Sequence, residues 1–356
     1  MADFIFDTIT PGQAAGFLPS DSLAFTTGSA DLMRATFLAA DQVALAMGER
    51  TVTFGAGIAG KAGALPGDGQ FFVGTAGPDA MSGPAGGATG NAFFGGAGDD
   101  VLTGGPAGDV LQGNQGADTM NGGGGNDTLF GGQDNDMILL GGGTDEHNLV
   151  NGSRGDDTIV GAGGGDTILG GQGADLINGG AGANLIFGDA GDDVIHGGAG
   201  ADTISGGPGY DIMSGGGGPD VFVFEPGSSV IDFQRSDRIL DWAPGDRIQL
   251  PVTGGFGVTM IASPPPPGPP TPPPGPYMYM GGMGHMGAGS APVDDFGAAA
   301  NAANSAFASD GALKIVAVQG GADVDVFVDT NADHMADMAI ILTNVTVDSV
   351  SAGNFI

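Results

Sequence analysis

Aspartate recurs at a fixed position in a nine-residue repeat that runs through the middle of the chain. The repeat has the form G-G-x-G-x-D-x-U-x, where U is a large apolar residue. A carboxylate beside glycine-rich backbone offers the oxygen ligands that hard divalent cations such as Ca²⁺ prefer. We therefore expect the sixth-position aspartates to bind calcium together with carbonyl oxygens of the glycine-rich turns. They are Asp79, Asp100, Asp109, Asp118, Asp127, Asp136, Asp145, Asp157, Asp166, Asp175, Asp193, Asp202, Asp211 and Asp220.

Each position of the repeat has a structural reason. Glycine allows a positive φ and lets the backbone come close to an ion. The x-U-x triplet is a minimal β-strand, in which U points to one face and its neighbours to the other. Two repeats make one turn of a coil, so residues 18 apart stack on strands about 4.8 Å apart. The predicted fold class is all-β: a right-handed parallel β-roll, which is a solenoid stacked on calcium, with β-rich caps at both ends.

The spacing of the aspartates predicts about eight ions or more. Eight pairs have the 18-residue separation of stacked turns: 100/118, 109/127, 118/136, 127/145, 157/175, 175/193, 193/211 and 202/220. The pairs 79/100, 136/157 and 145/166 are separated by 21 residues, so the spacing leaves open whether they form sites. Asn184 interrupts the aspartate column, and His147 stands at a normally apolar position, so both mark expected weak places. Three extra residues, 149–151, follow the unit that contains His147.

The composition excludes several classes of function. The chain has 8 Lys+Arg against 41 Asp+Glu and a formal charge of −33, whereas nucleic acids and anionic membrane surfaces require clustered basic residues. The absence of cysteine excludes disulfides, thiolate zinc sites and a cysteine nucleophile. The sequence contains no run of about 18 apolar residues, which is the length that would indicate a membrane span. Residues 1–10 lack the basic start of a secretory signal peptide.

The apolar core of such a roll is small. Each repeat buries one U side chain, which contributes about 1.5–3 kcal/mol. Ordering the backbone of its nine residues costs about 1–2 kcal/mol per residue. Stacked aspartates add repulsion between like charges. We therefore expect the repeats to be disordered without cations and to fold when calcium binds.

The repeats resemble those of RTX (repeats-in-toxin) proteins, which Gram-negative bacteria export by type I secretion. In that family the sixth-position aspartates of two stacked repeats bind calcium with turn carbonyls, which supports the aspartates named above but not Asn184 as an anionic ligand. Residues 221–250 resemble the strands that close these solenoids, and residues 312–356 resemble the C-terminal module of serralysin-type proteases, which carries an uncleaved export signal. The resemblance implies an extracellular or cell-surface protein of a Gram-negative bacterium, with a type I exporter as partner.

Composition and resemblance together divide the chain into five parts. The expected parts are a β-rich N-terminal cap (1–72), the nonapeptide roll (73–223), solenoid-closing strands (224–262), a Pro/Gly/Met-rich insertion (263–290) and a C-terminal β cap with the export signal (291–356). Within the last part, the alanine-rich segment 298–309 is expected to form a short helix.

Segments similar to the family fill most of the chain, which favours a non-enzymatic role. The family includes enzymes, but the sequence has neither the H-E-x-x-H motif of metalloproteases nor the G-x-S-x-G motif of lipases. We expect a structural or adhesive protein of the cell surface or matrix, without catalytic residues, that contacts surface components or itself. The alternatives are a self-assembling fibre or surface-layer subunit, a secreted enzyme whose unrecognised site lies in 1–72 or in the C-terminal cap, and a soft-metal-binding protein.

Three further motifs have both a functional and a structural interpretation. Residues 55–60 match G-x-G-x-x-G, but Pro66 and Gly67 would end the helix that a dinucleotide site needs, so a glycine-rich turn is favoured. A methionine-rich cluster is either a soft-metal site or an adaptable surface loop; it comprises Met278, Met280, Met283, His285 and Met286. An acidic loop is either a further calcium site or a polar hairpin turn; it comprises Asp329, Asn331, Asp333 and Asp337.

Overall fold

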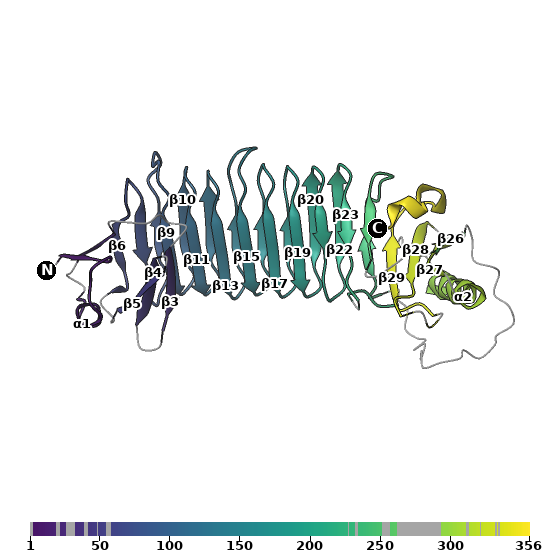
Figure 1. Ribbon diagram of the computed structural model, residues 1–356, viewed down its shortest axis with the longest axis horizontal. Coiled ribbons are helices and arrows are strands. Elements are labelled where there is room, and N and C mark those ends of the chain that lie inside the picture. Colours follow the sequence, from purple (N-terminus) through teal and green to yellow (C-terminus); the bar gives the residue numbers. More distant parts are fainter. Residues whose placement is uncertain are drawn as a thin grey trace.

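A computed structural model shows a long β-solenoid with a small folded unit at each end (Figure 1). The solenoid has about 8 turns, and about 9% of the residues are helical. The structure describes residues 3–18, 22–25, 33–38, 42–47, 49–54, 58–226, 228–231, 234–250, 257–261, 293–310, 313–320, 322–331, 333 and 335–356. The predicted insertion at 263–290, with its methionine cluster, lies outside the described residues, as do residues 55–57 of the glycine motif.

Two 13-stranded sheets form the two walls of the solenoid. Sheet 1 contains, in order, β1 (Asp3–Ile5), β2 (Ser22–Ala24), β6 (Lys61–Ala64), β7 (Gln70–Val73), β9 (Ala92–Ala97), β11 (Val110–Gln115), β13 (Thr128–Gln133), β15 (Leu149–Arg154), β17 (Thr167–Gln172), β19 (Leu185–Ala190), β21 (Thr203–Ser205), β23 (Val221–Val223) and β25 (Arg247–Gln249). Sheet 2 contains β8 (Ala80–Ser82), β10 (Val101–Gly105), β12 (Thr119–Gly123), β14 (Met137–Leu139), β16 (Thr158–Val160), β18 (Leu176–Asn178), β20 (Val194–Ala199), β22 (Ile212–Gly217), β24 (Asp237–Ile239), β29 (Met338–Leu342), β28 (Asp323–Val328), β27 (Leu313–Gly320) and β26 (Gly257–Ile261).

The strands of the repeats pair in parallel with the register that the period predicts. Leu111 stacks on Leu129 and Ile168 on Ile186, which are separations of 18 residues. The apolar eighth position of each repeat faces inward and is almost fully buried, while its two neighbours face outward. One central apolar line therefore holds both sheets together, and the prediction of an all-β parallel roll is confirmed.

The N-terminal unit covers one end of the roll. It contains the short helix α1 (Pro11–Ala15) and sheet 3, an antiparallel sheet of β3 (Met33–Phe37), β4 (Val43–Met47) and β5 (Arg50–Phe54). Its separate core is rich in phenylalanine, with the rings of Phe6 and Phe25 stacked at 4.6 Å between centroids. This core extends to Phe71 and Phe94 in the first strands of sheet 1, so the unit shields the end of the solenoid.

The C-terminal unit continues sheet 2. Strands β27, β28 and β29 pair in antiparallel order, and β29 joins the solenoid through β24. Helix α2 (Val293–Ser309) packs on these strands through Phe296 and Phe307, and two 3₁₀ turns, η3 (Val347–Ser349) and η4 (Ala352–Asn354), follow. The predicted helix is confirmed and begins five residues earlier than expected. In the described part of the chain, no helix is long and apolar enough to cross a membrane.

Truncating one residue of the central line should weaken the roll strongly. Ile186 is fully buried, so Ile186→Ala should cost about 2–5 kcal/mol of unfolding free energy, measured by denaturant titration in calcium. The neighbouring Leu185 is 38% exposed on the outer face, and Leu185→Ala should change the unfolding free energy by about 0.5 kcal/mol or less. Equal losses for the two variants would contradict this assignment of inner and outer faces.

Candidate metal centre

Two rows of buried polar side chains run along the two edges of the solenoid, one at each set of turns. Row 2 lies in the turns that lead into sheet 2 and comprises Asp79, Asp100, Asp118, Asp136, Asp157, Asp175, Asp193, Asp211 and Asp237. Row 1 lies in the turns that lead into sheet 1 and comprises Asn91, Asp109, Asp127, Asn148, Asp166, Asn184, Asp202, Asp220 and Asp246. Apart from the terminal Asp79, all of them are buried, with relative exposures of 3% or less.

Each row is a ladder of hydrogen bonds from coil to coil. The backbone N–H of Asp100 donates to Oδ1 of Asp118 at 2.8 Å, and the N–H of Asp118 donates to Oδ1 of Asp136 at 2.8 Å. The same bond repeats at every level of both rows, for example from Asp202 to Asp220 at 2.9 Å. One side-chain oxygen of each residue, from a carboxylate or an amide, therefore fixes the stacking of neighbouring coils.

The second carboxylate oxygen is left without a protein partner at most levels. Ten Oδ2 atoms are buried and make no hydrogen bond: those of Asp100, Asp109, Asp118, Asp127, Asp136, Asp157, Asp175, Asp193, Asp202 and Asp211. Burying a charged oxygen without a partner is costly. These atoms therefore require a cation or a proton.

The surroundings of the unpaired oxygens suit a hard cation. A Cβ on Gly113 would collide with Asp118 Oδ2 and would lie 2.7 Å from the carbonyl oxygen of Gly131 in the next coil. Glycine thus keeps open a small space bordered by a carboxylate oxygen and a carbonyl oxygen, which are the ligands that Ca²⁺ prefers. Among the described residues, no three acidic or histidine side chains converge on one point, so a bound ion would need backbone carbonyls as well as the aspartates.

Burial raises the pKa of these carboxyl groups. The pKa rises to about 8 at Asp127 and Asp136 and to about 7 at Asp175, mainly because burial disfavours the charged form. The charges of neighbouring aspartates add to the rise, while the hydrogen bond from the stacked backbone N–H opposes it. A bound cation would favour the charged form and release the protons.

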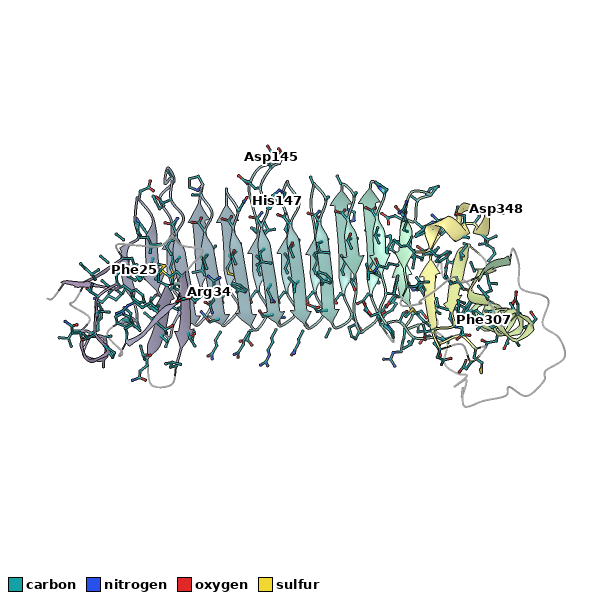
Figure 2. All side chains as sticks on the ribbon, viewed as in Figure 1. Phe25, Arg34, Asp145, His147, Phe307 and Asp348 are labelled. Atoms are coloured by element: carbon teal, nitrogen blue, oxygen red, sulfur yellow. The ribbon has the colours of Figure 1, made fainter. Side chains whose placement is uncertain are left out.

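The predicted register is wrong at one place, near His147. Asp127 donates its N–H to Asn148 Oδ1 at 2.8 Å, not to Asp145, and Asn148 pairs onward with Asp166. Asp145 lies exposed in a loop that projects from the upper edge of the roll (Figure 2). Val150, not His147, fills the buried line. The extra residues therefore lie in the turn, because an insertion within a strand would turn its apolar side chains outward.

Two pairings that the sequence left open are present in the structure. Asp79 donates its N–H to Asp100 Oδ1, and Asp136 donates to Asp157 Oδ1, both at 2.8 Å. The remaining members of the aspartate column lie in the two rows as predicted. Their role as calcium ligands stays a prediction.

Besides Asn148, three members of the rows were not predicted from the sequence: Asn91, Asp237 and Asp246. Asn91 accepts the N–H of Gln70, and Asp237 and Asp246 accept those of Asp211 and Asp220 across 26 residues. The signal for the last two was present, because D-R-I occurs at 237–239 and again nine residues later at 246–248. These aspartates carry both rows one level beyond the repeats.

The acidic loop near the C-terminus forms a hydrogen-bonded turn. Asp337 Oδ2 accepts the N–H and the hydroxyl of Thr330, and Asn331 Nδ2 donates to Asp337 Oδ1 at 3.1 Å. Asp333 Oδ1 accepts the N–H of Met335 at 2.9 Å, whereas Asp329 is fully buried. The structure thus brings Asn331, Asp333 and Asp337 together with their oxygens already engaged, and a calcium site there stays a prediction.

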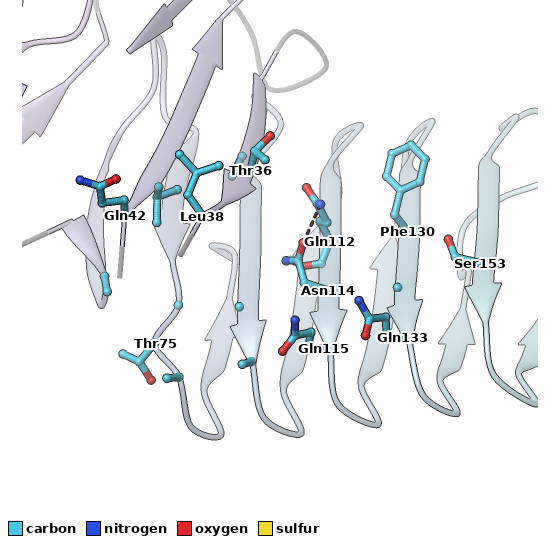
Figure 3. A pocket seen from close by; sticks show the side chains of 18 of the residues that line it. Thr36, Leu38, Gln42, Thr75, Gln112, Asn114, Gln115, Phe130, Gln133 and Ser153 are labelled. Atoms are coloured by element: carbon cyan, nitrogen blue, oxygen red, sulfur yellow. Dashed lines mark hydrogen bonds between the residues drawn. The ribbon is translucent and has the colours of Figure 1, made fainter. Parts of the chain in front are cut away.

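A groove of about 800 Å³ lies where sheet 3 meets the outer face of sheet 1. Figure 3 shows Leu38 on one wall and the amide side chains of Gln112, Asn114, Gln115 and Gln133 with the ring of Phe130 on the other. Gln112 Nε2 donates to Asn114 Oδ1 at 2.7 Å, which holds both amides in place. The described lining has no acidic residue and one charged residue, the exposed Arg154, although the chain carries a charge of −33.

Comparison with known proteins identifies the repeats. A family model described as the RTX calcium-binding nonapeptide repeat (4 copies) matches nine overlapping windows: residues 85–120, 103–138, 112–146, 142–177, 151–186, 160–195, 170–204, 178–213 and 187–222. A search of curated proteins found no match to the chain. The family match ends at residue 222, so the likeness of the C-terminal unit to that of serralysin-type proteases stays a prediction. The matched windows cover the stacked turns from Asn91 to Asp220, and residues 85–222 therefore form an RTX β-roll of calcium-binding nonapeptide repeats.

Proposed function

We propose that the chain is a secreted protein that folds on calcium outside a Gram-negative cell and acts there as a non-enzymatic structural or adhesive protein. The observation that carries this proposal is the set of ten buried aspartate Oδ2 atoms without a protein partner. RTX repeats are typical of secreted proteins. Extracellular calcium modules have a Kd of about 10⁻⁴–10⁻³ M, so calcium at these concentrations would drive folding outside the cell by linkage. A type I exporter would be the partner for export.

The groove beside sheet 3 favours an adhesive contact. Its amide side chains can both donate and accept hydrogen bonds, and Phe130 offers an apolar ring face. Such a lining suits an uncharged polar polymer that carries hydroxyl groups, such as a neutral polysaccharide. An acidic polymer would be repelled by the charge of the chain.

Binding of the calcium-loaded protein to immobilised dextran, starch and cellulose tests this contact. Gln115 and Gln133 are exposed in the groove, so the double variant Gln115→Ala/Gln133→Ala should stay folded and should weaken binding about tenfold. Gln249→Ala, on the same sheet at the far end of the roll, is the matched control and should bind like the unchanged protein. Equal binding by both variants, or no binding to any of the three polymers, would contradict the proposal for the groove.

Light scattering during calcium-induced folding distinguishes an adhesive role from that of a fibre subunit. A particle that stays monomeric while β-structure forms supports the adhesive role. Large assemblies that appear with the folding transition would favour a fibre or surface-layer subunit instead, and the two end units would then have to permit contact between rolls.

A further inference from the structure

The two rows of buried side chains differ in composition. Row 2 is aspartate at all nine of its levels, from Asp79 to Asp237. Row 1 has asparagine at three of its nine levels: Asn91, Asn148 and Asn184. The rows share the same ladder of hydrogen bonds and similar burial. The difference between them therefore lies in charge and in the amide group.

Each asparagine amide donates a hydrogen bond within the protein, two of them to the next member of row 1. Asn91 Nδ2 donates to Asp109 Oδ1 at 2.8 Å, and Asn148 Nδ2 donates to Asp166 Oδ1 at 3.0 Å. Asn184 Nδ2 donates to the carbonyl oxygen of Gly197 at 3.3 Å. An amide N–H can donate but cannot bind a cation. At these levels an amide nitrogen stands where an aspartate would place a second carboxylate oxygen, so no Oδ2 of the level itself needs an ion.

The unpaired oxygens are distributed accordingly. Row 2 contains seven buried Oδ2 atoms without a partner, and they occupy consecutive levels: Asp100, Asp118, Asp136, Asp157, Asp175, Asp193 and Asp211. Row 1 contains three: Asp109, Asp127 and Asp202. Between Asp127 and Asp202 no described level of row 1 has an unpaired Oδ2, and Asp166 Oδ2 accepts the N–H of Ala162 at 3.5 Å.

Exposed carboxylates also gather beside row 2. The turns that lead into sheet 2, together with the strand ends just before them, carry Asp99, Asp134, Asp156, Asp189 and Asp192. In the described turns of the repeats that lead into sheet 1, acidic residues outside row 1 itself occur only in the loop with Asp145 and Glu146. The negative potential that attracts cations is therefore stronger along the row 2 edge.

We propose that the two edges of the roll bind calcium unequally. Row 2 binds an unbroken line of ions and contains the tighter sites. Row 1 binds ions near Asp109 and Asp127 and near Asp202 and Asp220, while amide hydrogen bonds hold the levels from Asn148 to Asn184 without an ion. This inference rests on the proposed calcium-dependent folding and assigns that binding to one edge more than to the other.

Two substitutions of neighbouring repeats make a matched test in the full chain. Asp175 and Asp166 are both at most 2% exposed, and asparagine can keep the Oδ1 hydrogen bond of either residue. Asp175→Asn, in row 2, should raise the calcium concentration at half-folding about tenfold and lower the number of ions bound in calorimetry. Asp166→Asn, in row 1, should leave both quantities unchanged within about twofold.

A variant that should gain a calcium site distinguishes an effect on calcium binding from a simple loss of folding. Asn184→Asp places a third carboxylate between those of Asp166 and Asp202 in row 1, and it should increase the number of bound ions without weakening the fold in calcium. Equal effects of Asp175→Asn and Asp166→Asn, or an unchanged ion number for Asn184→Asp, would overturn the inequality of the edges. If the protein without substitutions bound no calcium at all, this result would instead overturn the proposed function.

Discussion

Removing calcium at neutral pH is expected to abolish the β-sheet signal of the roll. Ten buried carboxylate oxygens then have neither a protein partner nor a cation, and at each such level either an unpaired buried charge or the uptake of a proton at neutral pH opposes stacking. The central line of one apolar residue per repeat is too small to offset both this cost and the ordering of glycine-rich backbone. Far-UV circular dichroism in chelator, followed by calcium titration, measures the effect.

Trp242 provides a second probe of the same transition. It is 7% exposed at the C-terminal end of the solenoid core, where its ring lies 6.5 Å from that of Phe222. Its emission should shift to the red in chelator and return in calcium. Magnesium at the same concentration is the control and should not restore either signal, because Mg²⁺ demands a small octahedral shell and gives up water reluctantly. Retention of the β-sheet signal in chelator at pH 8 would show that apolar stacking alone suffices.

The sequence was sufficient where the period is regular. Between Asp100 and Asp136, and again between Asp157 and Asp220, the spacing of nine alone places each aspartate at a turn and each apolar residue in the core. This succeeds because side chains alternate between the two faces of a strand, so a shifted register would expose the whole apolar line. Fold and site were predictable together, since the same residues determine both.

The sequence was insufficient where chain length between levels varies. Asn148 and Val150 replace Asp145 and His147 in the rows and core because a turn can lengthen without changing which strand residues face inward. Asp237 and Asp246 were not predicted as row members because 26 residues separate them from the aspartates on which they stack. The spacing of nine identifies repeats, but only hydrogen-bond pairing shows which turns lie one above the other.

Lowering the pH in chelator is expected to restore part of the roll without calcium. The pKa values of the buried aspartates are raised, to about 8 at Asp127 and Asp136 and to about 6 at Asp157 and Asp193. In the unfolded chain the pKa of aspartate is about 3.9, so between pH 4 and about 8 the folded state binds more protons than the unfolded state. The stability of the ion-free fold therefore falls as pH rises through this window.

The sign reverses when calcium is present, and this contrast makes the prediction specific. Protons and calcium compete for the same Oδ2 atoms, so acidification from pH 8 to pH 6 should raise the calcium concentration needed for half-folding while it increases residual β-structure in chelator. The variant Asp175→Asn/Asp193→Asn has two fewer titrating groups in row 2 and should show a smaller pH effect in chelator. If acid instead reduced β-structure in chelator, the buried carboxylates would not be what opposes folding. The cost of the ion-free state would then have to come from backbone entropy alone.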